Sequence, residues 1–217
     1  MSRNNTHRNK ICGYCGLFTG STGEGEHVLP KCMYPTNALA RKPVQRIKIP
    51  SCRRCNQSLQ ADEGHARASL SAAGLNMTPE RREIWDAVMR GIRRGRAGRR
   101  DGLNILNQLR DGSILKPDGI PFKKIFPLDD ARVIHVIKKV VRGLCYGKTE
   151  EVIADENRIK LRPAEPALKE VLDKLYEVPK VFSAHAVFSE VPSPFHSIWF
   201  LNFYDNVLVG AYILPRS

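Results

Sequence analysis

The chain has 217 residues, of which 42% are hydrophobic and 26% charged, a composition typical of a globular protein with one large domain or two small ones. Its formal net charge of +13 is concentrated in the N-terminal half, where residues 1–60 hold ten Lys or Arg and two acids. This excess suits a polyanion such as nucleic acid, although a solvated, solubilising surface has the same composition. The start of the chain is polar, and polar residues interrupt the longest apolar stretch, so we expect a cytoplasmic protein with no export signal and no membrane partner.

The chain divides into three predicted parts. Residues 1–10 (MSRNNTHRNK) predict a disordered basic arm. Residues 11–75 are rich in Cys, Gly and Pro and have short apolar runs, which indicates a small module stapled by metal rather than by a large core. Residues 76–217 predict an α+β domain, and Leu75–Pro79 reads as the hinge before it.

The first predicted helix spans Pro79–Arg94, with Thr78 as the N-cap and Pro79 at its first position. Apolar residues recur along it at helical spacing. Its other face and the segment that follows are rich in Arg and Gly. Such a segment is suited to tracking a phosphate backbone, and it equally fits a solvated helix end.

The strongest helix prediction is Asp130–Cys145, whose Val, Ile and Leu residues form a broad apolar face. Asp129 or Asp130 would cap its start, and Gly147 would end it. Pro166–Tyr176 predicts a weaker helix.

Strands are predicted near the C-terminus. His185–Glu190 reads as one strand, and Ile198–Ile213 as two strands folded into an antiparallel hairpin at Asp205-Asn206. We expect this C-terminal part to orient a substrate or to bind a partner, either another protein or a second copy of the chain.

Two C-x-x-C pairs, separated by 36 residues, stand in the N-terminal part: Cys12 with Cys15, and Cys52 with Cys55. Two tight turns of this kind point four thiolates at one tetrahedral cation, so the pairs predict a structural zinc site. A redox motif is the alternative reading, but neither pair opens a βαβ unit, and a reducing compartment disfavours disulfides. Cys32 and Cys145 have no partner at ligand spacing, and we expect both to be packing residues.

Between and after these pairs stand Glu26-His27-Val28-Leu29-Pro30 and Asn56. The order C-x-x-C, E-H-V-x-P, C-x-x-C-N resembles the HNH endonuclease family over roughly residues 11–70. The resemblance implies a ββα-metal finger, in which a β-hairpin and a helix hold one divalent cation.

By this resemblance, His27 is the general base, and Glu26 and Asn56 ligate the catalytic cation. Oxygen ligands of this kind suit Mg²⁺ or Mn²⁺. A neutral imidazole can take the proton of an attacking water near pH 7. Neighbouring residues on a strand point to opposite faces, so Glu26 and His27 cannot both ligate one ion from a regular strand.

The chain departs from the commonest HNH pattern at two places. Glu26 stands where Asp or His is more usual, which leaves the metal preference open. The middle Asn of the family has no unambiguous counterpart, because Asn37, the candidate between the two cysteine pairs, can equally cap a turn.

Further polar residues follow Asn56. Gln60 lies one turn on and is close enough to reach the metal, whereas Glu63 is expected to be too far away, at about 10 Å by helical rise. His65 reads as a ligand, as a phosphate contact or, more simply, as a solvated helix residue.

Three cations flank the expected site. Lys48 precedes the second cysteine pair, and Arg53 and Arg54 stand between its two cysteines, so their side chains should project outward. We expect them to contact phosphates, with plain solvation as the alternative.

The sequence thus favours a metal-dependent endonuclease acting on nucleic acid, with DNA rather than RNA expected from the family. A zinc-finger protein that binds nucleic acid without cutting it is the second hypothesis, and an adaptor with a purely structural zinc site is the third. The pair Glu26-His27 separates them, because a protein that only binds has no need of a carboxylate beside an imidazole.

Overall fold

The structure is a computed structural model that describes residues 10–19, 24–36, 46–73, 78–95, 102–104, 107, 109–115, 121–125, 127–190 and 196–215, the segments 109–115 and 121–125 by their backbone alone. Four predictions fall wholly or partly outside these ranges: the basic arm in its residues 1–9, the role of Asn37, the hinge in its residues 75–77, and the Arg- and Gly-rich segment in its residues 96–101. No helix among the described residues is long and apolar enough to cross a membrane.

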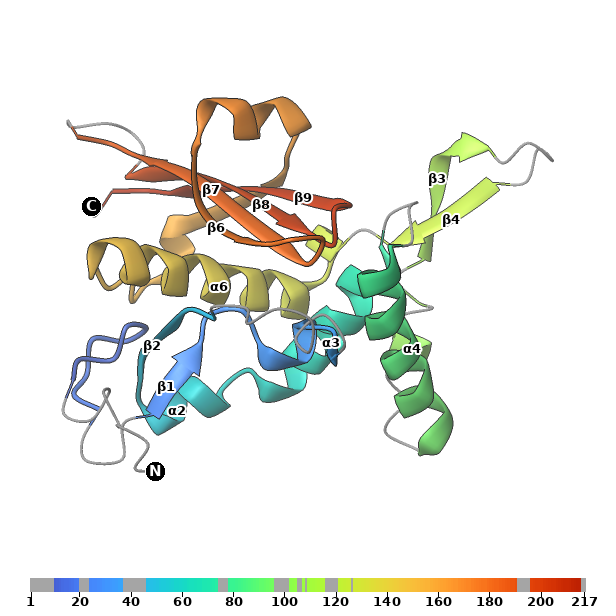
Figure 1. The fold of residues 1–217 in the computed structure, drawn as a ribbon, viewed down its shortest axis with the longest axis horizontal. Coiled ribbons are helices and arrows are strands. Elements are labelled where there is room, and N and C mark those ends of the chain that lie inside the picture. The colour runs from blue at the N-terminus through green and yellow to red at the C-terminus, as the bar shows by residue number, and fades with distance from the viewer. Residues whose placement is uncertain are drawn as a thin grey trace.

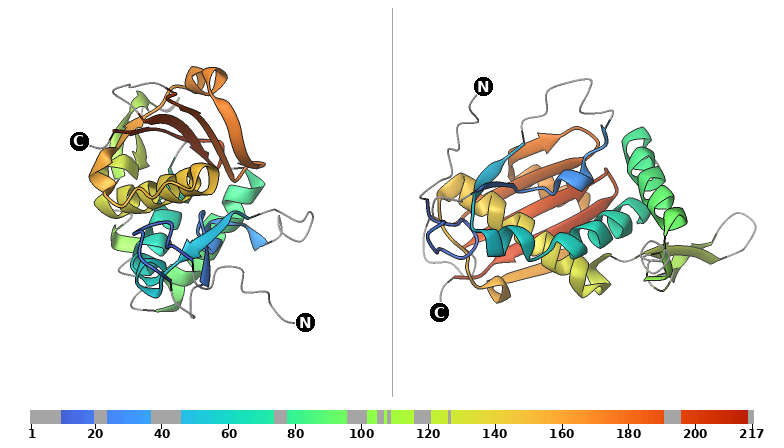
Figure 2. Two further views of the ribbon diagram at one scale, coloured as in Figure 1. Left: turned by 90° about the vertical axis from the view of Figure 1, so that its left-hand side faces the viewer. Right: turned by 90° about the horizontal axis from the view of Figure 1, so that it is seen from below.

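The described part of the chain is a mixed α and β structure in three layers, as the α+β prediction requires. A five-stranded antiparallel sheet forms one layer, in the order β5-β9-β8-β7-β6. Helix α6 (Ala131–Thr149) lies along one face of this sheet, and the N-terminal elements cover the opposite side of α6 (Figures 1 and 2). The sheet strands are β5 (Ile159–Pro163), β6 (Asp173–Val178), β7 (Phe182–Phe188), β8 (Ser197–Phe203) and β9 (Val207–Ile213).

The N-terminal layer is built from a strand pair followed by helices. Strands β1 (Glu24–His27) and β2 (Lys48–Ser51) are antiparallel, and the short helix α2 (Arg53–Gln57) follows β2 directly. We call the described part of residues 10–57 the N-terminal finger. Helix α3 (Gln60–Ala72) continues from the finger and packs against α6.

The remaining elements are peripheral. Helix α4 (Pro79–Arg94) and the strand pair β3 (Leu109–Leu115) and β4 (Pro121–Ile125) stand at one end of the molecule (Figure 1). Short 3-10 helices complete the described chain: η1 (Lys31–Met33), η2 (Pro127–Asp129), η3 (Glu156–Arg158) and η4 (Pro166–Val171).

Helix α6 forms where its apolar pattern predicts it. Asp130 caps its start and accepts hydrogen bonds from the backbone N–H groups of Arg132 and Val133, at 2.9 and 3.3 Å. The predicted end at Gly147 is wrong, because the helix continues to Thr149 and closes at Glu150, whose φ of 59° is left-handed. Gly147 lies within the helix, and Glu150 instead of Gly147 takes the left-handed conformation that ends it. The packing of α6 between two layers favours this longer helix.

Helix α4 has the predicted bounds, and the side chain of Thr78 accepts a hydrogen bond from the backbone N–H of Arg81, as expected of an N-cap. Arg81 itself is buried. Its guanidinium donates from Nε to the carbonyl oxygen of Ser71, at 2.7 Å, and from Nη2 to that of Ala73. Arg81 therefore places positive charge on the carbonyl end of α3 and fixes α4 to it.

The hairpin predicted for Ile198–Ile213 is present as β8 and β9, with a turn at Tyr204–Asn206. The predicted strand His185–Glu190 corresponds to β7, which is displaced toward the N-terminus. The predicted helix Pro166–Tyr176 is wrong in its second half, because only its first turns are helical, as η4, and β6 follows from Asp173. Pairing of β6 with β7 outweighs the helix propensity of this stretch.

A single cluster of buried residues runs through all three layers, for example through Val28 of the finger, Leu70 of α3, Val140 of α6 and Trp199 of β8. The contact is tight where α6 crosses the finger. A Cβ atom on Gly143 would lie 3.0 Å from the side chain of Val28, so the absence of a side chain at this position permits the close approach.

Candidate metal centre and catalytic site

Four cysteine thiols gather at one end of the finger. The Sγ atoms of Cys12, Cys15, Cys52 and Cys55 all lie within 4.8 Å of one another, and Cys15 Sγ and Cys52 Sγ are 3.8 Å apart. A hydrogen bond from Cys55 is the main reason that the pKa of the Cys12 thiol falls to about 4. The four sulfur atoms could hold one metal ion such as zinc, as the two C-x-x-C pairs predict.

The local backbone explains why the thiols converge. Gly16 has a φ of 75°, which lets the first turn fold back, and its N–H donates to the carbonyl oxygen of Cys12 at 2.9 Å. The N–H of Gly13 donates to the carbonyl oxygen of Pro50 at 2.9 Å, which ties the first turn to β2. Cys52 is the N-cap of α2, so the second pair enters the cluster at the start of that helix.

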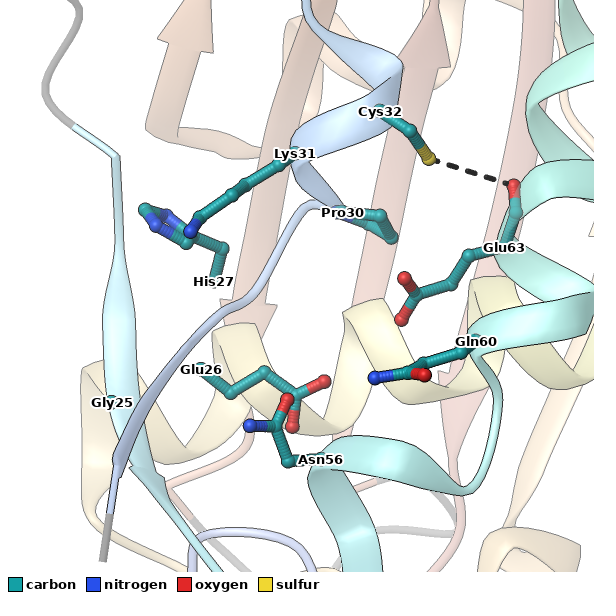
Figure 3. Close-up of a pocket in the computed structure, with 9 residues that line it drawn as sticks. All are labelled: Gly25, Glu26, His27, Pro30, Lys31, Cys32, Asn56, Gln60 and Glu63. Carbon is teal, nitrogen blue, oxygen red and sulfur yellow. Dashed lines mark hydrogen bonds between the residues drawn. The ribbon is translucent and has the colours of Figure 1, made fainter. Parts of the chain in front are cut away.

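The same strand pair presents Glu26 and His27. Glu26 pairs with Ile49 and His27 with Lys48 in the antiparallel register. Consecutive strand residues alternate in direction, and Figure 3 shows the Glu26 carboxylate and the His27 imidazole pointing to different sides of β1. The expectation that these residues cannot share one ion agrees with this arrangement.

Glu26 is 7% exposed, and both of its carboxylate oxygens are engaged. Ser51 Oγ donates to Oε2 at 3.0 Å, and the ammonium of Lys139 forms an ion pair with Oε1. Burial raises the pKa of the Glu26 carboxyl, and the positive charge and hydrogen bond of Lys139 oppose that rise.

Glu26 and Asn56 share a cavity of about 370 Å³ with Gln60 and Glu63. In Figure 3 the side chains of Glu26 and Asn56 approach each other, and those of Gln60 and Glu63 reach toward them from α3. Two kinds of oxygen donor, carboxylate and amide, therefore converge from three elements, β1, α2 and α3. Carboxylate and amide oxygens are ligands that a hard divalent cation prefers, so this donor set fits Mg²⁺ or Mn²⁺.

The expectation that Glu63 is too distant is wrong. It assumed one continuous helix from Asn56, but α2 ends at Gln57 and α3 begins at Gln60 after a turn at residues 58–59. The change of helix direction brings Glu63 into the cavity beside Gln60.

His27 lines the same cavity, but its ring is turned toward Lys31 and away from Asn56 (Figure 3). Burial, and to a smaller extent the charges of Lys48, Lys31 and Arg46, lower the pKa of the His27 imidazole to about 4. The imidazole is therefore neutral near pH 7, the form that accepts a proton. Its Nδ1 atom is buried and has no hydrogen-bond partner within the described segments.

The other candidates are placed as follows. His65 is 3% exposed and lies outside the cavity lining; its Nε2 is 2.9 Å from Oδ2 of Asp130, so the expectation of a solvated residue is wrong. Cys145 is fully buried, as expected. Cys32 lines the cavity, and its Sγ donates to the carbonyl oxygen of Glu63 at 3.8 Å. Burial raises the pKa of the Cys32 thiol to about 11.

The three cations expected at the surface, Lys48, Arg53 and Arg54, are all exposed. Lys31 and Arg46 join Lys48 near His27 and were not singled out from the sequence. The guanidinium of Arg46 lies 4.8 Å from the ring centre of Tyr34, which holds it in place by a cation–π contact.

Lys139 is a further residue beside this site that the sequence analysis missed. It stands on the apolar face of α6, one helical turn from Val136 and Gly143, and it is 6% exposed. A lysine on such a face signals a buried acidic partner, because an unpaired ammonium is too costly to bury. The sequence does not show which acid that is.

Compared with models of protein families, with curated proteins and with solved structures, the chain gives no significant match. The site must therefore be interpreted from its own geometry and chemistry.

Proposed function

We propose that this protein is a metal-dependent endonuclease of the HNH type that hydrolyses phosphodiester bonds of DNA. One observation carries the proposal: a strand pair and a short helix joined at a four-cysteine cluster bring a carboxylate, an amide and a neutral imidazole to one cavity. These are the residue types that the resemblance to the HNH family assigns to catalysis.

The four cysteines would hold a structural zinc ion, which fixes Asn56 relative to Glu26 because the cysteines belong to the same two segments of the finger. Such a zinc site needs reduced thiols, and a cytoplasmic location would keep them reduced. Glu26 and Asn56, with Gln60 and Glu63 beside them, would hold Mg²⁺ or Mn²⁺. When bound, that cation stabilises negative charge on the phosphate and on the leaving oxygen.

His27 would act as the general base. Its lowered pKa keeps the imidazole neutral at physiological pH, so it can accept the proton of the attacking water. Because its ring points away from Glu26, His27 is better suited to meet the water than to ligate the cation. The exposed side chains of Lys48, Arg53 and Arg54 would contact phosphates beside the cleaved bond.

The charge distribution supports a nucleic acid substrate, because the basic excess lies in the same half of the chain as this cavity. The choice of DNA over RNA comes from the family resemblance. A protein partner or a second copy of the chain would bind through the C-terminal part.

Nicking of supercoiled plasmid tests the proposal. The wild-type protein should nick it in the presence of Mg²⁺ or Mn²⁺, and His27→Ala should lose about 100-fold or more in rate. His135→Ala is the matched control, since His135 lies on α6, is half-exposed and pairs with Glu156 outside the cavity. Equal nicking by the wild type and His27→Ala would exclude His27 as the base.

A zinc-finger protein that binds nucleic acid without cutting it is the second candidate. The ion pair between Lys139 and Glu26 favours it, because this pair already neutralises the main candidate ligand. The two functions differ in one experiment: the binding protein shifts labelled DNA in a gel and leaves it intact with Mg²⁺ or Mn²⁺ present, whereas the nuclease cleaves it.

A further inference from the structure

We propose that the Lys139 ammonium is a resident cation of the candidate catalytic metal site, and that it competes with a divalent cation for the carboxylate of Glu26. The inference rests on the proposed function, since it concerns the same cavity. It adds a residue from α6 to a site that the sequence assigns entirely to the finger.

The contacts of Lys139 carry the argument. Its ammonium forms an ion pair with Oε1 of Glu26, and the two side chains are each 7% exposed. A second carboxylate, that of Glu63, places Oε1 at 3.4 Å from Nζ. Lys139 therefore contacts both acidic side chains that line the cavity, and its charge would lie close to any divalent cation that Glu26 holds.

Charge determines how the two cations interact. Two positive charges a few ångströms apart in a buried site repel strongly, because little water screens them. A divalent cation on Glu26 and the ammonium of Lys139 cannot both keep their best positions. Ser51 donates to Oε2 and Lys139 is paired with Oε1, so a cation that binds Glu26 must share the carboxylate with both groups.

Glu63 gives Lys139 an alternative position. The ammonium needs to move only from one carboxylate toward the other, and it would remain paired throughout. The ring of Tyr14 supports it, with Nζ 5.5 Å from the ring centre. Displacement of Lys139 therefore leaves no unpaired buried charge, which is the condition for exchange at a modest cost.

The arrangement has two effects on the site. Without a divalent cation, the ion pair with Lys139 holds the Glu26 side chain in place, so the ligand is positioned before the cation arrives. The same ion pair must be broken on binding, so Lys139 raises the concentration of divalent cation that is needed to fill the site.

Calorimetric titration of Mn²⁺ into the full-length, zinc-loaded protein tests the inference without reference to cleavage. The variants are Lys139→Met and Lys139→Gln, which lose the charge, and Lys139→Arg, which keeps it. Glu26→Gln gives the background of binding elsewhere. All variants are titrated in the same buffer at the same pH, so that their affinities are compared under one condition.

The inference expects Lys139→Met and Lys139→Gln to bind Mn²⁺ about tenfold or more tightly than wild type, and Lys139→Arg to bind within about threefold of it. Lys139→Gln can still donate a hydrogen bond to Glu26, so it stands in if the Met variant does not fold, as judged by circular dichroism. Glu26-dependent binding that is equal or weaker in the uncharged variants overturns the inference alone. Absence of any Glu26-dependent Mn²⁺ binding, in all variants, overturns both the inference and the proposed metal site.

Discussion

Asp130 and His65 join the helices α6 and α3 through a contact of 2.9 Å between Oδ2 and Nε2. The same carboxylate caps α6 through its other oxygen, Oδ1. One side chain thus starts the central helix and ties it to the helix that carries Gln60 and Glu63.

This pair predicts a stability effect that depends on pH. Asp130→Asn keeps a good N-cap but loses the charge toward His65, and it should lower the free energy of unfolding by about 2 kcal/mol at pH 7. Burial raises the pKa of the Asp130 carboxyl, but the hydrogen bond and charge of His65 outweigh it, with help from the N–H groups of Val133 and Arg132, so the net pKa lies below 3.8. Urea unfolding of both proteins measures the difference.

The lowered pKa of Asp130 determines how the stability difference changes with pH. A carboxyl whose pKa is lowered by folding stabilises the protein above its unfolded pKa, and the stabilisation is lost as the pH falls through the folded value. The gap between wild type and Asp130→Asn should therefore close as the pH falls below 3.8. A gap that persists undiminished well below pH 3.8 would contradict this account of the pair.

We predict that replacement of Arg81 also lowers the free energy of unfolding. Replacement by Met keeps most of the side-chain volume but leaves the carbonyl oxygens of Ser71 and Ala73 without their guanidinium donor. We expect a loss of about 3 kcal/mol in the free energy of unfolding, measured by denaturant titration. The neighbouring Arg82→Met is the control, because Arg82 is exposed and its replacement should change stability by less than about 0.5 kcal/mol.

The cysteine cluster predicts dependence on bound metal. Cys52→Ser should lose the zinc and unfold the finger, since structural zinc can supply on the order of 10 kcal/mol of folding free energy in a small module. Zinc content measured by mass spectrometry and the melting curve are the readouts. Cys32→Ser, a cysteine outside the cluster, should retain the zinc. Full zinc content in Cys52→Ser would rule out the four-sulfur site.

We predict that replacement of Asn56 lowers the activity without lowering the stability. Its side chain reaches the cavity, and its backbone N–H bonds to the carbonyl oxygen of Cys52, a contact that Ala retains. Asn56→Ala should therefore melt as the wild type does and lose plasmid nicking by about 100-fold. Gln57→Ala, the exposed next residue of α2, should nick at the wild-type rate.

Local signals were sufficient for several elements. The apolar spacing and caps of α4 and α6 predicted both helices, and the polar turn at Asp205-Asn206 predicted the β8–β9 hairpin. The two C-x-x-C pairs predicted the cysteine cluster. The helices and the hairpin have their physical cause in residues close together in the sequence, and the cysteine cluster was predictable because each pair is itself a short local motif.

The rest depends on contacts between distant segments. The strands β5 and β6 are edge strands whose pairing is decided by β9 and β7, and their own sequences carry no strong alternation. The break between α2 and α3 has neither Gly nor Pro to announce it, so the entry of Glu63 into the cavity was not predictable from the helix pattern. The position of Lys139 on an apolar helix face indicates a buried acidic partner, but only the fold shows that Glu26 is that partner.

The continuous core between the finger, α6 and the sheet has a consequence for how this protein can change during evolution. A recombined segment that carried the cysteine pairs and Glu26-His27 but ended at residue 75 would lack Lys139, the ion-pair partner of Glu26. It would also lack Gly143 of α6, against which Val28 packs. Drift at the interior positions of α6 should instead be matched by compensating changes in the finger, so that the two parts are inherited together.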